Sequence, residues 1–376
     1  MLFRSVTANN MVIKITPSAV TTTLAGSPTS GNVDGVGTAA SFNNPVGICI
    51  DASGNIYVAD KGNFKIRKIT PSGVVSTFAG SGVTGTVNAT GSAASFQNPT
   101  GICISPSGDL YVTDQMNFSL PYPWNPKVRK IDAGQVVTDF CYLNGNCHGL
   151  AAVSNSLFIV QPNTGIGSNS IHYCSTSAAT GTISLYAGSS SGTGGMADGP
   201  LLSALFGGPI GITKTPSGDL LVADNGNHRI RLVSATTVTT VAGNGGIACV
   251  DGPVATANFW GPNSLAIASN GDIYVGDNLC KSVRKITGLN LQVGIKENMK
   301  FNENFYMYPN PANEKITISL ENVDKTTKCK IINLVGNVVG EFTTQSLVND
   351  IDISMLPSGI YFLNVNESTT RKFIKY

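Results

Sequence analysis

Four aspartates recur along the chain, each followed at short spacing by an arginine. The pairs are Asp60 and Arg67, Asp114 and Arg129, Asp224 and Arg231, and Asp277 and Arg284. A carboxylate at a strand end can accept turn N–H bonds and pair with a nearby guanidinium. Such pairs could present a ring of charge to a ligand. Because a catalytic group is usually unique and these pairs recur, we expect them to stabilise the fold.

One pair breaks the pattern, because its arginine follows after fifteen residues instead of seven. The extra residues include the sequence SLPYPWNPK, in which three prolines stiffen the chain. Phe118, Tyr122 and Trp124 give this insertion an aromatic surface. Rigid aromatic side chains are efficient contacts for sugars, peptides and proteins. We expect these three residues to contact a ligand; the alternative is that they pack over a neighbouring repeat.

Residues for metal binding or catalysis are sparse. The three histidines, His148, His172 and His228, have no short ligand spacing, and the first glutamate is Glu297. No Ser/His/Asp set, P-loop or dinucleotide fingerprint stands in a suitable context. We therefore expect no catalytic residue, no metal site and no cofactor. The exception left open is calcium, to which the Asp-Gly aspartates could offer oxygen ligands. These are Asp34, Asp198 and Asp251.

The chain has eight cysteines, which suits an exported protein. Cys141 and Cys147 flank an Asn-Gly turn and could close a small loop. Cys249 and Cys280 fall on connections of one face of one repeat, so a disulfide between them is geometrically possible. Cys49 and Cys103 occupy equivalent apolar strand positions and are expected to be buried thiols. Cys174 and Cys329 have no evident partner.

A repeat with a period near 54 residues must position these groups. Its marker is a phenylalanine at positions 42, 96, 206 and 259, with a degenerate copy in the longer gap. Each copy alternates four short apolar segments with turn residues; in the first they are 47–50, 55–59, 65–69 and 74–79. Four antiparallel strands repeated around an axis are typical of a β-propeller blade. The sequence thus predicts an all-β fold.

Composition sets the domain boundaries. The chain has 376 residues, of which 12% are charged and 41% apolar, with a net charge of +2. The low net charge disfavours nucleic acid as a partner, and the apolar fraction disfavours disorder. No apolar run is long enough for a transmembrane segment.

All glutamate lies after residue 287, where glycine becomes scarce. We expect a propeller at 1–287, a linker at 288–304 and a second domain at 305–376.

The repeat has the consensus sequence PxGIxxxxxGxIYVADxxNxxIRKI, which resembles the NHL-repeat family of β-propellers over roughly residues 10–287. Five inner halves plus one N-terminal outer half favour six blades, a number that is common in that family. Asn9–Gly26 matches only the second half of a copy, so we expect a partial first blade without its two inner strands. The rival arrangement has this hairpin complete the last blade. The first residues, MLFRS, show no signal-peptide pattern, and we expect the sequence to be truncated at its N-terminus.

The C-terminal segment resembles the type A sorting domain of type IX secretion substrates in Bacteroidetes-like bacteria. Three motifs carry this resemblance: Tyr308, Pro309, Asn310 and Pro311; Leu356, Pro357, Ser358 and Gly359; and Lys372, Phe373, Ile374 and Lys375. It implies a small immunoglobulin-like β-sandwich that the export machinery recognises and then removes. The expected location is extracellular or at the outer-membrane surface, with the signal peptide lost by truncation.

Together these features predict a secreted or cell-surface propeller that acts as a binding or scaffold module for a protein or glycan ligand. One alternative is a metal-dependent propeller lyase or hydrolase. Another is a structural adhesion or surface-layer component.

Overall fold

The computed structural model describes residues 2–375 except 17, 116–125, 144, 146, 163–167, 269, 290–304, 309–311, 321–326, 334–336, 347 and 366–368. The chain divides into two compact units, Met1–Gln292 and Val293–Tyr376. The helices of the described residues are single 3-10 turns: η1 (Thr7–Asn9), η2 (Gly37–Ala39), η3 (Lys61–Asn63), η4 (Gly91–Ala93) and η5 (Asn225–Asn227). None of them is long or apolar enough to cross a bilayer.

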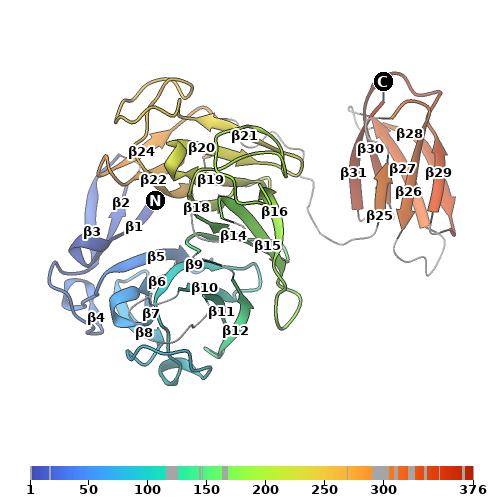
Figure 1. Ribbon diagram of the computed structural model, residues 1–376. Coiled ribbons are helices and arrows are strands. Elements are labelled where there is room, and N and C mark those ends of the chain that lie inside the picture. The colour runs from blue at the N-terminus through green and yellow to red at the C-terminus, as the bar shows by residue number, and fades with distance from the viewer. Residues whose placement is uncertain are drawn as a thin grey trace. The chain divides into compact units, whose positions relative to one another are not determined.

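Six antiparallel sheets surround a common axis in the first unit, as Figure 1 shows. The first sheet contains β1 (Leu2–Val6), β2 (Met11–Ile15) and β3 (Thr21–Gly26). The second contains β4 (Gly35–Val36), β5 (Pro45–Ile50), β6 (Ile56–Asp60), β7 (Lys65–Ile69) and β8 (Val74–Ala79). The third contains β9 (Pro99–Ile104), β10 (Leu110–Asp114), β11 (Lys127–Ile131) and β12 (Val137–Tyr142).

The other three sheets complete the ring. The fourth contains β13 (Leu150–Val153), β14 (Ser156–Gln161), β15 (Ser170–Ser175) and β16 (Ser184–Gly188). The fifth contains β17 (Gly199–Pro200), β18 (Pro209–Lys214), β19 (Leu220–Asp224), β20 (Arg229–Val233) and β21 (Thr237–Ala242). The sixth contains β22 (Pro262–Ile267), β23 (Ile273–Asp277) and β24 (Ser282–Ile286). The architecture is a six-bladed β-propeller, as the sequence predicts.

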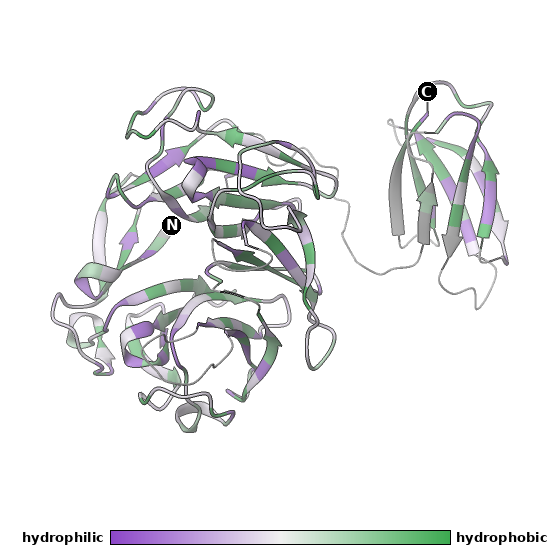
Figure 2. Cartoon of the chain, viewed as in Figure 1, coloured by the Kyte–Doolittle hydropathy of each residue, from purple (hydrophilic) through white to green (hydrophobic). Residues whose placement is uncertain are grey.

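Burial explains why these segments form blades. The second strand of the full sheets is buried at every position, because sheets cover both of its faces. The hydrophobic residues accordingly gather on the strands, as Figure 2 shows. The cores form between sheets rather than within one: Tyr57 and Ala59 of the second blade share a cluster with Leu110 and Val112 of the third. No blade can bury its apolar faces alone.

The first blade corrects one expectation from the sequence. It is partial, as predicted, but its described residues form three strands, so one inner strand is missing rather than two. β1 pairs with β2 from Leu2 opposite Ile15 to Val6 opposite Met11. The segment LFRSV lacks the consensus residues of a second strand, but backbone pairing and packing suffice to form one. The rival arrangement is wrong, because β1, β2 and β3 form their own sheet.

A glycine near the start of the first strand lets neighbouring blades approach each other. A Cβ on Gly101 would lie 1.9 Å from the carbonyl oxygen of His148, and one on Gly149 would lie 2.5 Å from that of Ile210. The first strands of successive blades contact each other around the axis through these positions. In the sixth blade the equivalent residue is Ser264, and its side chain is exposed. This position of the repeat is therefore glycine wherever the backbone of the next blade lies directly against it.

The C-terminal unit consists of two antiparallel sheets. One contains β25 (Phe305–Tyr308), β26 (Lys315–Leu320) and β29 (Val348–Asp352). The other contains β27 (Thr327–Asn333), β28 (Val338–Thr344), β30 (Gly359–Val365) and β31 (Thr369–Lys375). Ile316 and Ile318 of the first sheet share one core with Ile331, Leu363 and Phe373 of the second. The unit is a β-sandwich; its immunoglobulin-like topology stays a prediction.

Gly101→Ala should destabilise the propeller, because the new methyl group would overlap the backbone of the fourth blade. Overpacking of this kind costs roughly 1–3 kcal/mol of unfolding free energy. Urea unfolding of the wild type and the variant measures the difference. Ser264→Ala is the matched control, since that position already carries a side chain, and its effect should be within about 0.5 kcal/mol. Equal effects of the two substitutions would contradict the close approach of the inner strands.

Candidate functional site

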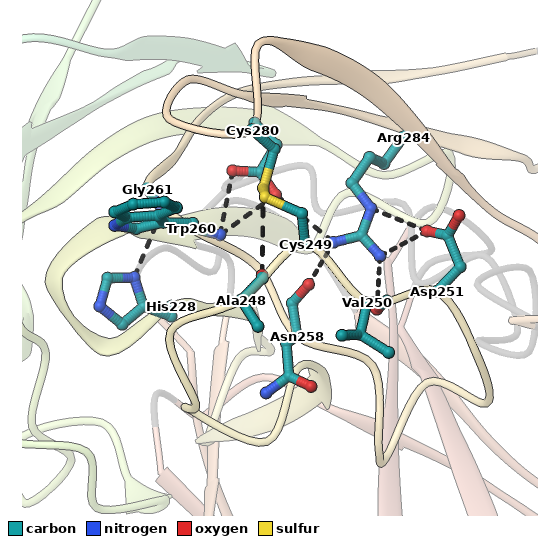
Figure 3. Close-up of a disulfide and its surroundings, with 11 residues drawn as sticks. His228, Ala248, Cys249, Val250, Asp251, Asn258, Trp260, Gly261, Cys280 and Arg284 are labelled. Carbon is teal, nitrogen blue, oxygen red and sulfur yellow. Dashed lines mark hydrogen bonds and ion pairs between the residues drawn. A yellow bond between two sulfur atoms is a disulfide. The ribbon is translucent and has the colours of Figure 1, made fainter.

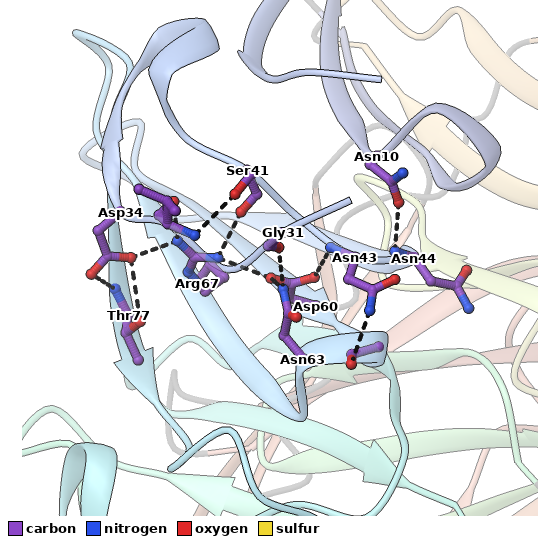
Figure 4. A network of polar contacts seen from close by, with 12 residues as sticks. Asn10, Gly31, Asp34, Ser41, Asn43, Asn44, Asp60, Asn63, Arg67 and Thr77 are labelled. Atoms are coloured by element: carbon purple, nitrogen blue, oxygen red, sulfur yellow. Dashed lines mark hydrogen bonds and ion pairs between the residues drawn. The ribbon is translucent and has the colours of Figure 1, made fainter. Parts of the chain in front are cut away.

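A buried arginine organises each regular blade, and Figure 4 shows the one in the second blade. Arg67 donates hydrogen bonds to Asp60 at 2.9 Å, to Asp34 at 2.5 Å and to the carbonyl oxygens of Val33 and Ser41. Its guanidinium lies 5.2 Å from the ring centroid of Phe42, at cation–π distance. The arginine thus ties the connection that enters the blade to the end of β6.

The same arrangement, which we call the Asp–Arg–Phe cluster, recurs in three more blades. The arginine-to-aspartate distances are 3.3 Å for Arg129 and Asp114, 2.7 Å for Arg231 and Asp224, and 3.4 Å for Arg284 and Asp277. The corresponding rings are Phe96, Phe206 and Phe259, at 5.2, 5.2 and 4.7 Å. The four aspartates are at most 1% exposed, so a dissolved ligand cannot reach them. This placement agrees with a structural role.

Burial also raises the pKa of three of these aspartates. Desolvation raises the pKa of Asp60 and Asp224, and it raises the pKa of Asp114 to about 6. Hydrogen bonds from neighbouring groups and the attraction of the arginines act in the opposite direction. In the second blade the backbone N–H of Asn43 and the side chain of Asn63 both donate to Asp60 at 2.8 Å. Each carboxylate is thus hydrogen-bonded on both oxygens.

The aspartates considered for calcium face the same arginines. Asp34, Asp198 and Asp251 lie 2.5, 2.7 and 2.5 Å from the arginine of their blade. Asp34 also accepts a hydrogen bond from the N–H of Thr77, and Asp198 accepts one from Thr240. A calcium ion at these carboxylates would compete with the guanidinium for the carboxylate charge. Among the described residues, no three His, Cys, Asp or Glu side chains are grouped so that they could hold a metal ion.

The fourth blade has a neutral version of the cluster. In the fourth blade, His172 of β15 pairs with Ile159 of β14. In the second blade, Arg67 of β7 pairs with Val58 at the equivalent place in β6. His172 therefore occupies the arginine position. Gln161 ends β14 where Asp60 ends β6, and both Gln161 and His172 are buried. Ser170 Oγ lies 3.4 Å from His172 Nδ1, and desolvation lowers the pKa of His172. The strand register identifies Gln161 and His172 as the replacements for aspartate and arginine. The sequence of this blade is too degenerate to align with the other copies at these positions.

A disulfide changes the sixth blade. In the second blade Asn63 donates to the carbonyl oxygen of Gly31 at 2.7 Å, and in the fifth Asn227 bonds Gly195 in the same way. Cys280 occupies this position in the sixth blade and is bonded to Cys249. Figure 3 shows the disulfide between the incoming connection and the turn after β23. A covalent bond thus replaces the hydrogen bond that the asparagine makes elsewhere.

The other predicted bridge is wrong. Cys141 and Cys147 are both free and buried. Cys141 lies in β12, and the Cys174 thiol and burial raise the pKa of its own thiol. Spacing along the chain suggested a small loop, but the direction of a strand side chain decides which sulfur it meets.

The sixth blade also exposes an aromatic side chain beside the disulfide. Trp260 is 42% exposed and stands where the other blades have Asn43, Gln97 and Gly207. Leu279, 52% exposed, stands where the second blade has Gly62. These substitutions put two large apolar groups on one blade. The sequence alone did not single them out, although a comparison of repeat positions for large apolar substitutions could have done so.

The backbone around Trp260 is held firmly. Its N–H donates to both carboxylate oxygens of Asp277, at 3.1 and 3.2 Å. The next N–H, of Gly261, donates to His228 Nδ1 at 3.3 Å, and Asn225 donates to the carbonyl oxygen of Pro262 at 3.0 Å. Figure 3 shows Trp260 and His228 together on one side of the disulfide. We call Trp260, Leu279, His228 and Asn225 the Trp260 surface; it combines a rigid indole with polar groups from the fifth blade.

The predicted aromatic residues Phe118, Tyr122 and Trp124 lie outside the described residues. Their segment joins β10 to β11, and Leu279 lies on the matching connection between β23 and β24. Strands alternate in direction, so these connections and the links between blades leave the sheets at one face of the ring. The ends of the insertion, Gln115 and Pro126, are therefore on the face that carries the Trp260 surface.

Comparison with known families identifies both parts of the chain. Residues 42–69, 96–120 and 206–231 match the NHL repeat, and residues 306–376 match the secretion system C-terminal sorting domain. The chain thus contains NHL repeats followed by a type IX sorting domain, as the sequence predicts. The sorting domain points to secretion, to an extracellular or cell-surface location, and to recognition by the secretion machinery.

Curated relatives share the propeller. NHL repeat-containing protein 2 of Bos taurus is 29% identical over 290 residues, covering 67% of this chain. Protein SUPPRESSOR OF QUENCHING 1, chloroplastic, of Arabidopsis thaliana is 26% identical over 273 residues, covering 70% of this chain. The match spans only 40% and 21% of these two relatives.

Solved structures agree on the fold. A gluconolactonase from Xanthomonas campestris is 12% identical with a TM-score of 0.50, and the match covers 73% of this chain and 77% of that one. An auxiliary nutrient binding protein from Bacteroides ovatus is 16% identical with a TM-score of 0.53, covering 74% and 64%. At these identities the similarity establishes the β-propeller and nothing about its ligand.

Arg231→Ala should destabilise the propeller strongly, because it leaves the carboxylate of Asp224 buried without its cation. Removing one partner of a buried ion pair costs about 3–5 kcal/mol. The matched control is Lys285→Ala, which breaks a partly exposed pair with Asp272 and should cost at most about 1 kcal/mol. Urea unfolding compares the two variants. A loss for Arg231→Ala no larger than that of the control would contradict the proposed structural role.

His172 should make the propeller sensitive to acid. Its folded-state pKa lies below the unfolded value of about 6.5, so the unfolded chain binds the proton first. The neutral imidazole therefore contributes stability above pH 6.5, and this contribution falls as the pH drops below that value. His172→Gln should show a smaller loss of Tm between pH 7 and pH 5 than the wild type. Parallel Tm curves for the two proteins would contradict this role of His172.

Proposed function

We propose that this protein is a binding or scaffold module for a protein or glycan ligand outside the cell, and that the Trp260 surface takes part in ligand binding. The sorting domain supplies the route to that location. The propeller supplies a rigid ring on which individual positions can change without altering the fold.

Trp260 is the observation that carries the proposal. Water-exposed indole rings are costly in a monomer but are enriched at the energetic centres of binding interfaces. Here the ring stands on a backbone fixed by Asp277 and, nearby, by the Cys249–Cys280 disulfide. A preorganised aromatic group loses little conformational entropy on binding. The indole face suits the C–H face of a sugar or an apolar side chain, and the neighbouring His228 and Asn225 offer polar contacts.

The chemistry of the described residues supports binding over the alternative of a metal-dependent lyase or hydrolase. The carboxylates that recur through the propeller are buried and hydrogen-bonded to arginines. No described group of three potential metal ligands stands near the Trp260 surface. The aromatic insertion with Phe118, Tyr122 and Trp124 starts and ends on the same face, so both aromatic groups could contact one large ligand.

Fluorescence can test each aromatic group separately, because the chain has only two tryptophans. Trp124→Phe leaves Trp260 as the sole reporter, and Trp260→Phe leaves Trp124. Screening the full chain against surface glycans and peptides, with titration of the hits, should shift the emission of the Trp260-only variant. Trp260→Ala should then weaken binding at least tenfold, whereas substitution of the distant, exposed Val83 by Ala should leave it unchanged.

Three results would decide against this proposal. A ligand that binds without changing the Trp260-only emission would place the binding site elsewhere. Turnover in a panel of hydrolase and lyase substrates, with stoichiometric bound metal, would favour the enzyme. Self-association without any ligand would favour an adhesion or surface-layer role.

A further inference from the structure

Two basic side chains flank the Trp260 surface without an acidic partner. Arg229 follows His228 at the start of β20, and Lys281 follows Cys280 in the turn after β23, where it is exposed. Among the residues that the structure describes, no carboxylate forms an ion pair with either of them. Both positive charges are therefore available to a ligand.

Hydrogen bonds of the backbone place both basic residues close to the indole. The N–H of Leu279 donates to the carbonyl oxygen of Trp260 at 3.0 Å, and the N–H of Asn278 donates to that of Gly261 at 3.1 Å. On the other side, the N–H of Gly261 donates to His228 Nδ1 at 3.3 Å. The backbone at Trp260 and Gly261 is thus bonded to both segments that carry the basic side chains.

The guanidinium of Arg229 has a fixed position with a donor to spare. Its Nη2 donates to the carbonyl oxygen of Asn244 at 3.0 Å, whereas its Nε is buried and has no hydrogen-bond partner. Asn244 in turn accepts a hydrogen bond at 2.7 Å from Asn258, two residues before Trp260. A Cβ on Gly245 would lie 3.1 Å from the guanidinium, so the absence of a side chain there leaves room for the arginine.

The acidic residues of this region are committed to the fold. The chain segments that meet here, 225–229, 243–261 and 278–281, contain a single acidic residue, Asp251. It is bonded to Arg284 at 2.5 Å, as Figure 3 shows. Asp277 is fully buried and accepts the N–H of Trp260. The free charge around the indole is therefore positive, and a complementary ligand is negative.

The backbone at the indole is already hydrogen-bonded within the protein. Trp260 donates its N–H to Asp277 and accepts from Leu279 at its carbonyl oxygen. Gly261 likewise uses both its N–H and its carbonyl oxygen. A peptide that binds by backbone pairing finds no free partner at these residues. A sugar chain needs instead an aromatic face and side-chain donors, which the indole and the two basic side chains supply.

We propose that the Trp260 surface binds an acidic polysaccharide. The indole stacks on a sugar ring, and Arg229 and Lys281 pair with carboxylate or sulfate groups of the adjoining sugars. This inference rests on the proposed function and names the class of ligand. The second blade provides a comparison, because Lys65 occupies the Arg229 position there and lies against Gly82 as Arg229 lies against Gly245. The next blade, however, has the buried Gln97 at the Trp260 position, so that cation lacks an exposed indole.

Titration with polymers of known charge tests the proposal. The full chain carrying Trp124→Phe reports on Trp260 alone, and the probes are alginate, dextran sulfate, uncharged dextran and poly-glutamate. Alginate or dextran sulfate should shift the emission, and dextran should not; the two acidic polymers distinguish carboxylate from sulfate recognition. Raising NaCl from about 0.1 M to about 1 M shortens the Debye length from ~10 Å to ~3 Å and should weaken binding.

Charge-neutralising variants locate the contact. Arg229→Gln and Lys281→Gln should each weaken binding of the acidic polysaccharide about three- to fivefold, the size of one exposed ion pair. Lys65→Gln is the matched control and should leave the affinity unchanged. Because Lys281 is exposed, its variant keeps the test valid even if Arg229→Gln fails to fold.

Several outcomes would overturn the inference. Dextran that binds as tightly as the acidic polymers would remove the role of charge, and equal losses for Lys65→Gln and Arg229→Gln would place the contact elsewhere. Poly-glutamate that shifts the emission where the acidic polysaccharides do not would assign the surface to an acidic protein. In each case the proposed function stands if some ligand alters the Trp260 emission; no change with any glycan or peptide would contradict both proposals.

Discussion

The burial of a paired arginine in each regular blade is the constraint on which the propeller depends. Desolvating a guanidinium and a carboxylate is costly, and the cost is offset only if every donor and acceptor finds a partner in good geometry. Arg67 meets most of this demand: its two terminal nitrogens bond two aspartates and two carbonyl oxygens, its guanidinium lies over a phenylalanine ring, and only its Nε has no hydrogen-bond partner. Those partners come from the connection between blades and from the end of β6. The hydrogen bonds of one arginine therefore fix the backbone path of the connection and of the strand end together.

The blades that lack part of this arrangement show what it does. In the sixth blade Cys280 replaces an asparagine, and the disulfide to Cys249 holds the incoming connection where a hydrogen bond holds it elsewhere. With the backbone fixed in this way, the position of Trp260 can carry a large side chain in place of a small polar one. The fourth blade has the neutral pair Gln161 and His172, and free thiols gather at its boundary with the third blade.

Residues that hold the fold together are thus separate from residues that vary between blades. Repeated residues maintain the ring, and residues that depart from the repeat are available for contacts with other molecules. The C-terminal sandwich has its own core, formed by residues such as Ile318, Leu363 and Phe373, and so it can fold as a separate unit.

The sequence by itself determined the blade period, the strands and the recurring Asp and Arg positions, because local alternation and turn residues encode them. It also indicated the sorting domain, through the resemblance of three C-terminal motifs to that family. It did not reveal β1, whose residues Leu2–Val6 lack the repeat consensus and form a strand only by pairing with β2. Nor did it show that Cys141 and Cys147 are free thiols or that Trp260 is exposed. Only the tertiary structure decided these, since they depend on which side chains neighbouring blades bring together and which surfaces they leave uncovered.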